Sequence, residues 1–130
     1  MPELPEVETE RRRLAARLDG RTLAAVAISD SRLTRPDDPA AIAATLAGAR
    51  VEAVERRGKY IAVRLSNGRT LLVHLRMTGG FRYEPATHER AVLTLGDGVR
   101  VAYRDVRRFG TWSLHESEKA DEHLAVRLGP

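Results

Sequence analysis

The chain has 130 residues, of which 42% are hydrophobic, so it can form one domain with a substantial core. It contains no cysteine, which excludes a disulfide scaffold, a zinc site with thiolate ligands and a cysteine nucleophile within this sequence. The net charge of +4 is a mild indication of nucleic-acid binding and fits an ordinary basic domain equally well. No apolar stretch approaches the roughly 20 residues of a membrane span, and the acidic start does not resemble a signal peptide. We therefore expect a cytosolic protein.

The first 48 residues contain both helices that the sequence predicts. A helix is expected over residues 5–18, because glutamates cluster in its first turns and arginines follow towards its end, the order that the helix dipole favours. Gly20 is its expected C-terminal cap. Residues 22–29 indicate a strand, residues 31–39 form a turn-rich stretch, and the alanine-rich residues 39–48 predict a second, short helix.

From residue 50 onward the pattern changes to short strands and tight turns. The Asn67-Gly68 pair between two alternating runs is a strong hairpin signal, and residues 96–98 form a second one. Residues 77–80 are expected to form a turn, and residues 105–110 an arginine-rich loop. Strands are predicted over 49–57, 59–66, 69–76, 81–84, 90–96, 100–104 and 111–116. The predicted fold is therefore α+β and mainly β, an antiparallel sandwich of about eight short strands with an N-terminal helix and one further short helix.

The N-terminus carries the most distinctive chemistry. Removal of Met1 would leave Pro2 with a free secondary amine, whose pKa lies near 7.7–8.0 and is lowered by the partial positive charge of a helix start. Such an amine can attack an aldehyde-level carbon to form an iminium, and the adjacent Glu3 could transfer a proton. From these two residues alone, the alternative that Pro2 merely begins a helix and Glu3 complements its dipole is the better interpretation.

Six further observations, taken together, favour the chemical interpretation. They are the start Met-Pro-Glu-Leu-Pro-Glu-Val-Glu-Thr, the segment Arg56–Tyr60, the segment His74–Gly79, His88, the loop Asp105–Gly110 and the closing Leu128–Pro130. In this order and over the full chain, these motifs resemble the formamidopyrimidine-DNA glycosylases, bifunctional base-excision repair enzymes related to endonuclease VIII. The resemblance covers all 130 residues.

The resemblance implies a role for each candidate residue. Pro2 would be the nucleophile, Glu3 a proton donor, and Lys59 an assistant in base excision and strand cleavage. His74, His88 and Arg108 would hold DNA phosphates, and so would Lys59. The set that fills the gap left by a flipped nucleotide would be Met77, Arg107 and Phe109. We expect Pro2, Glu3, Lys59, Met77 and Arg107 to line one face.

The residues alone leave plainer alternatives open. Met77 and Phe109 could equally be core residues, His74 an interior or solvent-facing histidine, and Lys59 a solvated charge at a strand start. Lys59 is one of only two lysines among the 22 basic residues, which makes its retention mildly suggestive.

The resemblance also implies the substrate and the partner. The substrate would be double-stranded DNA containing oxidised bases or abasic sites, and the lesions would be oxidised purines such as 8-oxoguanine and formamidopyrimidines. The protein would be a monomer without a membrane partner. An endonuclease VIII-like enzyme for oxidised pyrimidines is an alternative, although Leu4 resembles the purine-specific branch more closely. A catalytically silent DNA-binding fragment and a plain interaction domain with a basic surface are two further alternatives.

The sequence departs from the family pattern in three respects. The family commonly has glycine where Arg76 stands and proline where Val106 stands, so we expect a changed backbone preference or an added phosphate contact. Residues 1–130 would be the N-terminal catalytic domain, and the family's helix–two-turn–helix module and four-cysteine zinc finger are absent from the chain. No cofactor is expected in this chain, whereas a zinc ion is expected in that missing C-terminal module.

Overall fold

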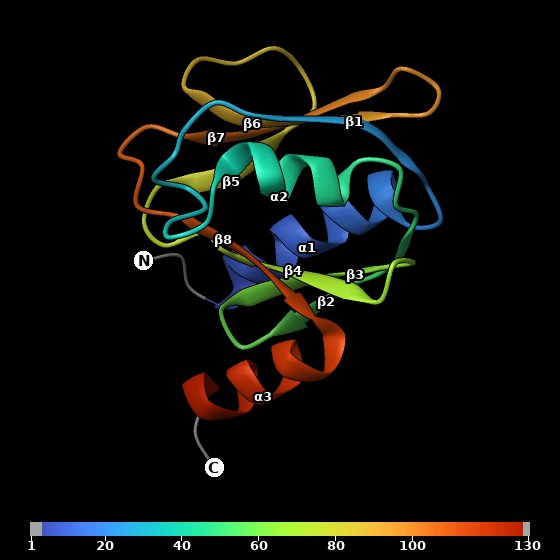
Figure 1. Ribbon diagram of the computed structural model, residues 1–130. Helices are drawn as coiled ribbons and strands as arrows, with labels where there is room; N and C mark the ends of the chain where they lie inside the picture. The colour runs from blue at the N-terminus through green and yellow to red at the C-terminus, as the bar shows by residue number, and fades with distance from the viewer. Residues whose placement is uncertain (1–3, 129–130) are drawn as a thin grey trace.

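Two antiparallel four-stranded sheets face each other in the computed structural model, which describes residues 4–128 (Figure 1). The first sheet has the order β1 (Leu23–Ile28), β6 (Glu89–Leu95), β7 (Arg100–Asp105) and β5 (Gly79–Arg82). The second has the order β2 (Val51–Arg57), β3 (Tyr60–Leu65), β4 (Arg69–His74) and β8 (Thr111–Glu116). The predicted sandwich of about eight strands is confirmed.

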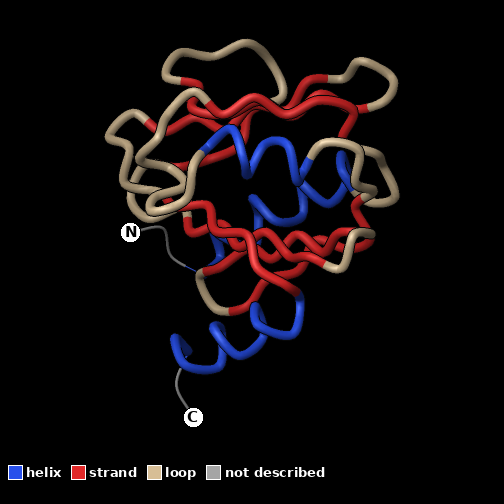
Figure 2. Tube along the Cα trace, in the orientation of Figure 1, coloured by secondary structure: helices blue, strands red, loops and turns tan. Residues whose placement is uncertain are grey.

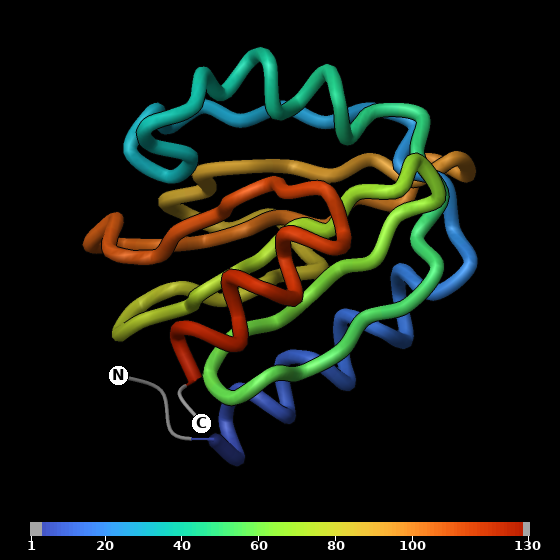
Figure 3. Tube along the Cα trace, turned by 60° about the horizontal axis from the view of Figure 1, so that its bottom comes forward, coloured from blue at the N-terminus to red at the C-terminus, as the bar shows by residue number. Residues whose placement is uncertain are grey.

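Helices α1 (Leu4–Leu18) and α2 (Pro39–Leu46) close opposite open edges of the sandwich, and both were predicted (Figures 1, 2 and 3). After α1, Gly20 adopts the left-handed φ of 75° that was expected of its cap. The side chain of Asp38 caps α2 by accepting a hydrogen bond from the N–H of Ala40. Each helix places its apolar stripe against the sheets, as with Leu14 and Leu18 of α1.

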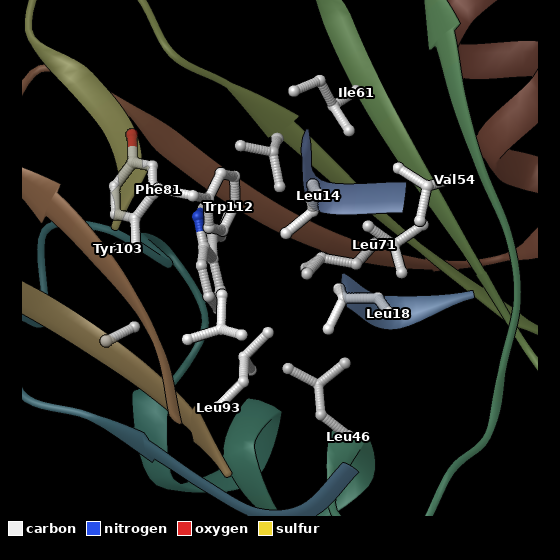
Figure 4. Packing of buried hydrophobic residues seen from close by; sticks show 14 of the residues in the cluster. Leu14, Leu18, Leu46, Val54, Ile61, Leu71, Phe81, Leu93, Tyr103 and Trp112 are labelled. Carbon is white, nitrogen blue, oxygen red and sulfur yellow. The ribbon is translucent and has the colours of Figure 1, made fainter. Parts of the chain in front are cut away.

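The main core fills the space between the sheets. Its centre is aromatic: Trp112 of β8 lies 5.4 Å from Tyr103 of β7 and 6.3 Å from Phe81 of β5, measured between ring centroids (Figure 4). The three rings come from both sheets and are almost inaccessible to solvent. They join the sheets at the end where β4 leads into β5 and β7 leads into β8. This close packing supports the two loops that connect these strands.

A third helix, α3 (Ser117–Leu128), was not predicted. It packs on the outer face of the second sheet, where its buried Ala120 and Leu124 contact Ala62 and Leu72. Only these two apolar positions face the sheet, so the helical periodicity of residues 117–128 is weak in the sequence. The expectation that helices are confined to the first 48 residues is therefore wrong. None of the helices in residues 4–128 is long and apolar enough to cross a membrane.

Candidate nucleic-acid interface

Two loops that connect the sheets lie next to each other. Residues 75–78 connect β4 to β5, and residues 106–110 connect β7 to β8. The loops share their neighbours at both ends, because His74 pairs with Thr111 and Gly79 pairs with Asp105. The expected turn at residues 77–80 is thus shorter, since Gly79 and Gly80 already belong to β5. The β2–β3 turn, which contains Lys59, lies at the same end of the sandwich (Figures 1 and 3).

A buried carboxylate ties the two loops together. Asp105 is 1% exposed, and its Oδ1 accepts hydrogen bonds from the hydroxyl of Thr78 and from the N–H of Arg108, the latter at 3.0 Å. Its Oδ2 accepts a hydrogen bond from the N–H of Gly110 at 2.7 Å. One side chain therefore sets the position of the β4–β5 loop relative to the β7–β8 loop.

The Tyr103 hydroxyl explains why two glycines stand at this junction. A Cβ atom at Gly79 or at Gly110 would collide with that hydroxyl oxygen. At Gly110 the added atom would also lie 2.9 Å from Oδ2 of Asp105 and 3.1 Å from the carbonyl oxygen of His74. Both loops can approach the buried tyrosine only where the side chain is a hydrogen atom.

Within residues 4–128, three residues other than glycine have a positive φ, namely Arg76, His88 and Arg108, with values of 52°, 59° and 61°. Arg76 and Arg108 lie on the two tethered loops. His88 lies beside them, because its carbonyl oxygen accepts a hydrogen bond from the N–H of Asp105 at 3.1 Å. Strained backbone of this kind clusters at functional sites. Arg76 therefore has a left-handed backbone at a position where formamidopyrimidine-DNA glycosylases commonly have glycine.

The two loops expose large apolar side chains. Met77 is 58% exposed and Phe109 is 40% exposed, so the alternative that they are core residues is excluded. The guanidinium carbon of Arg107 lies 5.1 Å from the centre of the Phe109 ring, a cation–π contact. The structure thus brings Met77, Arg107 and Phe109, the three residues predicted to fill the gap in the DNA, onto adjacent loops.

Arg108 is oriented by a partner that the sequence did not reveal. Its Nε and Nη2 donate to the two carboxylate oxygens of Asp30 at 2.9 and 2.7 Å. Asp30 is 5% exposed, and this bidentate pairing lowers the pKa of its carboxyl group. Because the Arg108 side chain remains 38% exposed, its guanidinium can still meet an anion from solvent.

His74 is neutral in this structure at neutral pH. It is 7% exposed, and burial lowers its pKa to about 4, with smaller contributions from the charges of Arg76 and Lys59. Its Nδ1 accepts a hydrogen bond from the N–H of Arg76 at 3.2 Å, which leaves the ring proton on Nε2. The edge of this ring meets Tyr60 at a centroid distance of 4.7 Å. His74 can therefore donate one hydrogen bond to a phosphate but cannot supply a positive charge.

A pocket of about 360 Å³ lies between α1 and the β4–β5 loop. Glu6 and Glu10 of α1 line one side, and Met77 and Thr78 line the other. Glu10 accepts a hydrogen bond from the N–H of Phe81 at 3.3 Å, and burial raises the pKa of its carboxyl group. Pro2 and Glu3 lie outside the described residues, which begin at Leu4.

Sequence reasoning missed two residues of this site. Asp105 belonged to a recognised motif, but nothing in the motif assigned it a structural role. Asp30 lies 78 positions from Arg108, and no spacing rule connects two residues so far apart.

Comparisons with known proteins agree with this geometry. The family model described as the formamidopyrimidine-DNA glycosylase N-terminal domain matches residues 1–112. Proteins named formamidopyrimidine-DNA glycosylase from Halorhodospira halophila and Acidiphilium cryptum are 44% and 43% identical over the whole chain. The chain covers 50% and 48% of these two proteins, so it spans about half the length of the curated relatives it matches.

Solved structures extend the likeness to the fold. A crystal structure of the Lactococcus lactis protein Fpg in complex with DNA containing an abasic site superposes with a TM-score of 0.85 and 31% identity. It covers 94% of this chain, which spans 47% of the Lactococcus protein. A structure of MutM in complex with DNA containing carbocyclic 8-oxo-G gives the same TM-score, identity and coverage. The chain therefore belongs to the formamidopyrimidine-DNA glycosylase family and corresponds to the N-terminal half of its members.

Proposed function

We propose that this chain provides the catalytic half of a DNA glycosylase with AP lyase activity that removes oxidised purines from duplex DNA. The observation that carries the proposal is the pair of tethered loops that expose Met77 and Phe109 among arginines. Large apolar side chains held at a cationic surface are costly in water and typical of a binding site. Relatives bearing the family name and solved complexes with abasic or 8-oxo-G DNA support the same conclusion.

The loops suit an enzyme that flips its target nucleotide out of the helix. Flipping leaves a hole in the base stack, and apolar wedges such as Met77 and Phe109 can fill that hole while the duplex bends. Arg107, next to Phe109, can donate hydrogen bonds to the edge of the unpaired partner base. Because Asp105 fixes one loop relative to the other, the wedges would enter the duplex as one unit.

Phosphate contacts would supply the affinity and the register. Arg108 offers a charged group held in place by Asp30, and Lys59 lies close enough to affect the pKa of His74. His74 offers a neutral Nε2–H donor, and His88 lies beside the β7–β8 loop. Such contacts fix the DNA without reading the lesion.

The pocket between α1 and the β4–β5 loop is the proposed entry point for the flipped nucleotide. Its volume of about 360 Å³ falls in the range of small-ligand sites. Glu6 lines it from the first turns of α1, and Pro2 precedes the first residue of that helix by two positions. Met77 lines the same pocket, so the wedge and the flipped nucleotide would occupy neighbouring places.

The proposed chemistry starts from the Pro2 amine with Met1 removed. The amine nitrogen attacks C1′ of the damaged nucleotide, and the glycosidic bond breaks as its electron pair leaves with the base. Glu3 assists protonation as the sugar ring opens to the iminium. The iminium makes a C2′ proton acidic, its removal expels the 3′ phosphate, and a second elimination can release the 5′ phosphate. Lys59 would assist base excision and strand cleavage.

The rest of the DNA-binding cleft would come from a part of the protein outside residues 1–130. We propose that the protein continues into a helix–two-turn–helix module and a zinc finger, because this chain spans about half of its relatives. The zinc ion would belong to that second half and would not take part in the steps above. The assembled protein would act as a monomer on DNA.

Methionine removal provides the test of the nucleophile. With Met1 attached, the Pro2 nitrogen is an amide whose lone pair is delocalised, so it is neither basic nor nucleophilic. Full-length protein with and without Met1 should bind abasic-site DNA equally well, whereas borohydride should trap a covalent complex only with the Met-free form. Equal trapping by both forms would identify another amine, Lys59 first, as the nucleophile. Binding without trapping by the Met-free form would favour a catalytically silent DNA-binding protein.

A further inference from the structure

A second cleft is lined in part by His74. The loop before α2, strand β8, helix α3 and the end of β4 surround about 710 Å³ of space. Arg35 comes from the loop, His115 from β8, and His123 and Arg127 from α3. None of these four residues belongs to the motifs that suggested the family, and none is needed for the chemistry proposed above.

The cleft has an excess of positive charge. Arg35, Arg76 and Arg127 all line it, against Asp37 as its single acidic residue. Among residues 4–128, no carboxylate forms an ion pair with any of these three guanidinium groups. Three guanidinium groups without a carboxylate partner repel one another across the cleft, and a bound anion would remove that repulsion.

Neutral hydrogen-bonding groups line the space between the charges. The rings of His115 and His123 lie 4.9 Å apart, and Nε2 of His115 is 2.9 Å from the hydroxyl oxygen of Ser113. Arg127 Nε donates to Nε2 of His123 at 3.1 Å, which leaves the proton of that ring on Nδ1. The described residues include no group of three or more side chains arranged to hold a metal ion. The donors and cations therefore suit an anion better than a cation.

We propose that this cleft binds a phosphate group through Arg35, Arg127 and the paired imidazoles of His115 and His123. A phosphate oxyanion accepts several hydrogen bonds at once, which matches donors arriving from a loop, a strand and a helix. His74 and Arg76 also line the cleft, so it adjoins the DNA-binding face proposed above. The phosphate can belong to the backbone of a DNA strand or to a small phosphorylated molecule.

The test follows the histidine rings of the 130-residue chain by NMR during titration with inorganic phosphate at constant ionic strength. Three of the four histidines line the cleft. The backbone amide of Gly98 serves as the internal reference, because it lies in the β6–β7 turn, at the end of β7 away from the cleft. We expect saturable shifts of the His115 and His123 signals while the Gly98 amide signal stays in place. The double variant R35Q/R127Q should bind phosphate about tenfold more weakly, as expected for lost charge-assisted hydrogen bonds.

Arg69→Gln is the control for loss of a surface charge outside the cleft. It removes one positive charge, half the change made in R35Q/R127Q, from an exposed position at the opposite end of β4 and should leave the phosphate affinity unchanged. The proposal is overturned if the His115 and His123 signals do not saturate. It is also overturned if the Gly98 amide signal shifts in parallel with them, or if R69Q weakens binding as much as R35Q/R127Q does. Backbone amide spectra of each variant verify its fold, and the wild-type titration stands without any variant.

Binding of undamaged duplex DNA then separates the two sources of phosphate. If the cleft holds the DNA backbone, R35Q/R127Q lowers the slope of log affinity against log salt by about 2. If the slope is unchanged while inorganic phosphate still saturates the cleft, the natural ligand is a small phosphorylated molecule. The phosphate titration needs neither a lesion nor Pro2, so its failure would leave the proposed glycosylase function intact. Likewise, failure of the borohydride trapping experiment would leave the proposed phosphate site intact.

Discussion

Asp105→Asn is the substitution that most directly probes how the two interface loops are held. The carboxylate accepts hydrogen bonds from Thr78, Arg108 and Gly110, and Asp105 is only 1% exposed to solvent. An asparagine amide has the same shape but keeps only one acceptor oxygen. Whichever way it turns, its NH₂ group must face at least one N–H or hydroxyl donor that the carboxylate satisfied.

The expected loss of stability follows from these contacts. A hydrogen bond to a charged group contributes about 1.5–3 kcal/mol, and a buried donor left without an acceptor costs about 1–3 kcal/mol. Losing at least one such bond predicts that the free energy of unfolding falls by about 2–4 kcal/mol. That is a large part of the roughly 5–15 kcal/mol by which ordinary domains are stable.

Urea unfolding monitored through Trp112 measures this change. Trp112 is the only tryptophan of the chain and is 1% exposed, so its fluorescence reports on the core between the sheets. Thr78→Val provides a graded control, because it removes one donor and leaves the carboxylate with its two N–H partners, for an expected loss of about 1 kcal/mol. A stability of Asp105→Asn within about 0.5 kcal/mol of the wild type, the usual range of neutral surface changes, would refute the argument that this carboxylate holds the loops.

Two further predictions concern the same junction. Gly110→Ala should destabilise the fold by about 1–3 kcal/mol, since the added methyl group collides with the Tyr103 hydroxyl, whereas Gly96→Ala, with open space around it, should be nearly neutral in the same unfolding assay. The folded-state pKa of His74 lies near 4 because of burial, against about 6.5 when unfolded. The unfolded state therefore binds more protons between these values, and His74 should cost about 2 kcal/mol of stability between pH 7.5 and pH 5. His74→Gln should show a correspondingly smaller loss over this range, and an equal loss in both proteins would contradict the assignment.

The sequence predicted those elements whose signals are local. Asn67-Gly68 between two alternating runs needs a tight hairpin whatever surrounds it, and the order of acids and bases in residues 5–18 favours a helix by itself. The segment that forms α3 has no comparable signal. Its two buried residues, Ala120 and Leu124, pack on the outer face of a sheet, and Asp121 pairs with Arg64 of that sheet. The local sequence reveals neither the sheet nor these partners.

In the candidate site, too, the sequence predicted what depends on residue type and missed what depends on tertiary contacts. Residue type and motif order selected Met77 and Phe109, but only their exposure in the fold distinguishes a surface wedge from a core residue. Residue type also predicted His74 as a phosphate ligand, whereas its burial decides that the ring is uncharged. Asp30 could not be predicted because its partnership with Arg108 exists only after the β7–β8 loop packs beside the loop that follows β1.

The left-handed residues at this end of the sandwich show how the fold retains side chains where glycine would be easier to accommodate. A residue other than glycine in this conformation costs about 1–2 kcal/mol, and each of the three has one hydrogen bond that offsets the cost. Asp105 accepts from the N–H of Arg108 and donates its own N–H to the carbonyl oxygen of His88, while Nδ1 of His74 accepts from the N–H of Arg76. Glycine would keep these backbone bonds and relieve the strain, but it would remove two guanidinium groups and an imidazole from the surface. The strain is thus tolerated where the side chain meets solvent, which is the arrangement expected if Arg76, His88 and Arg108 contact an anion.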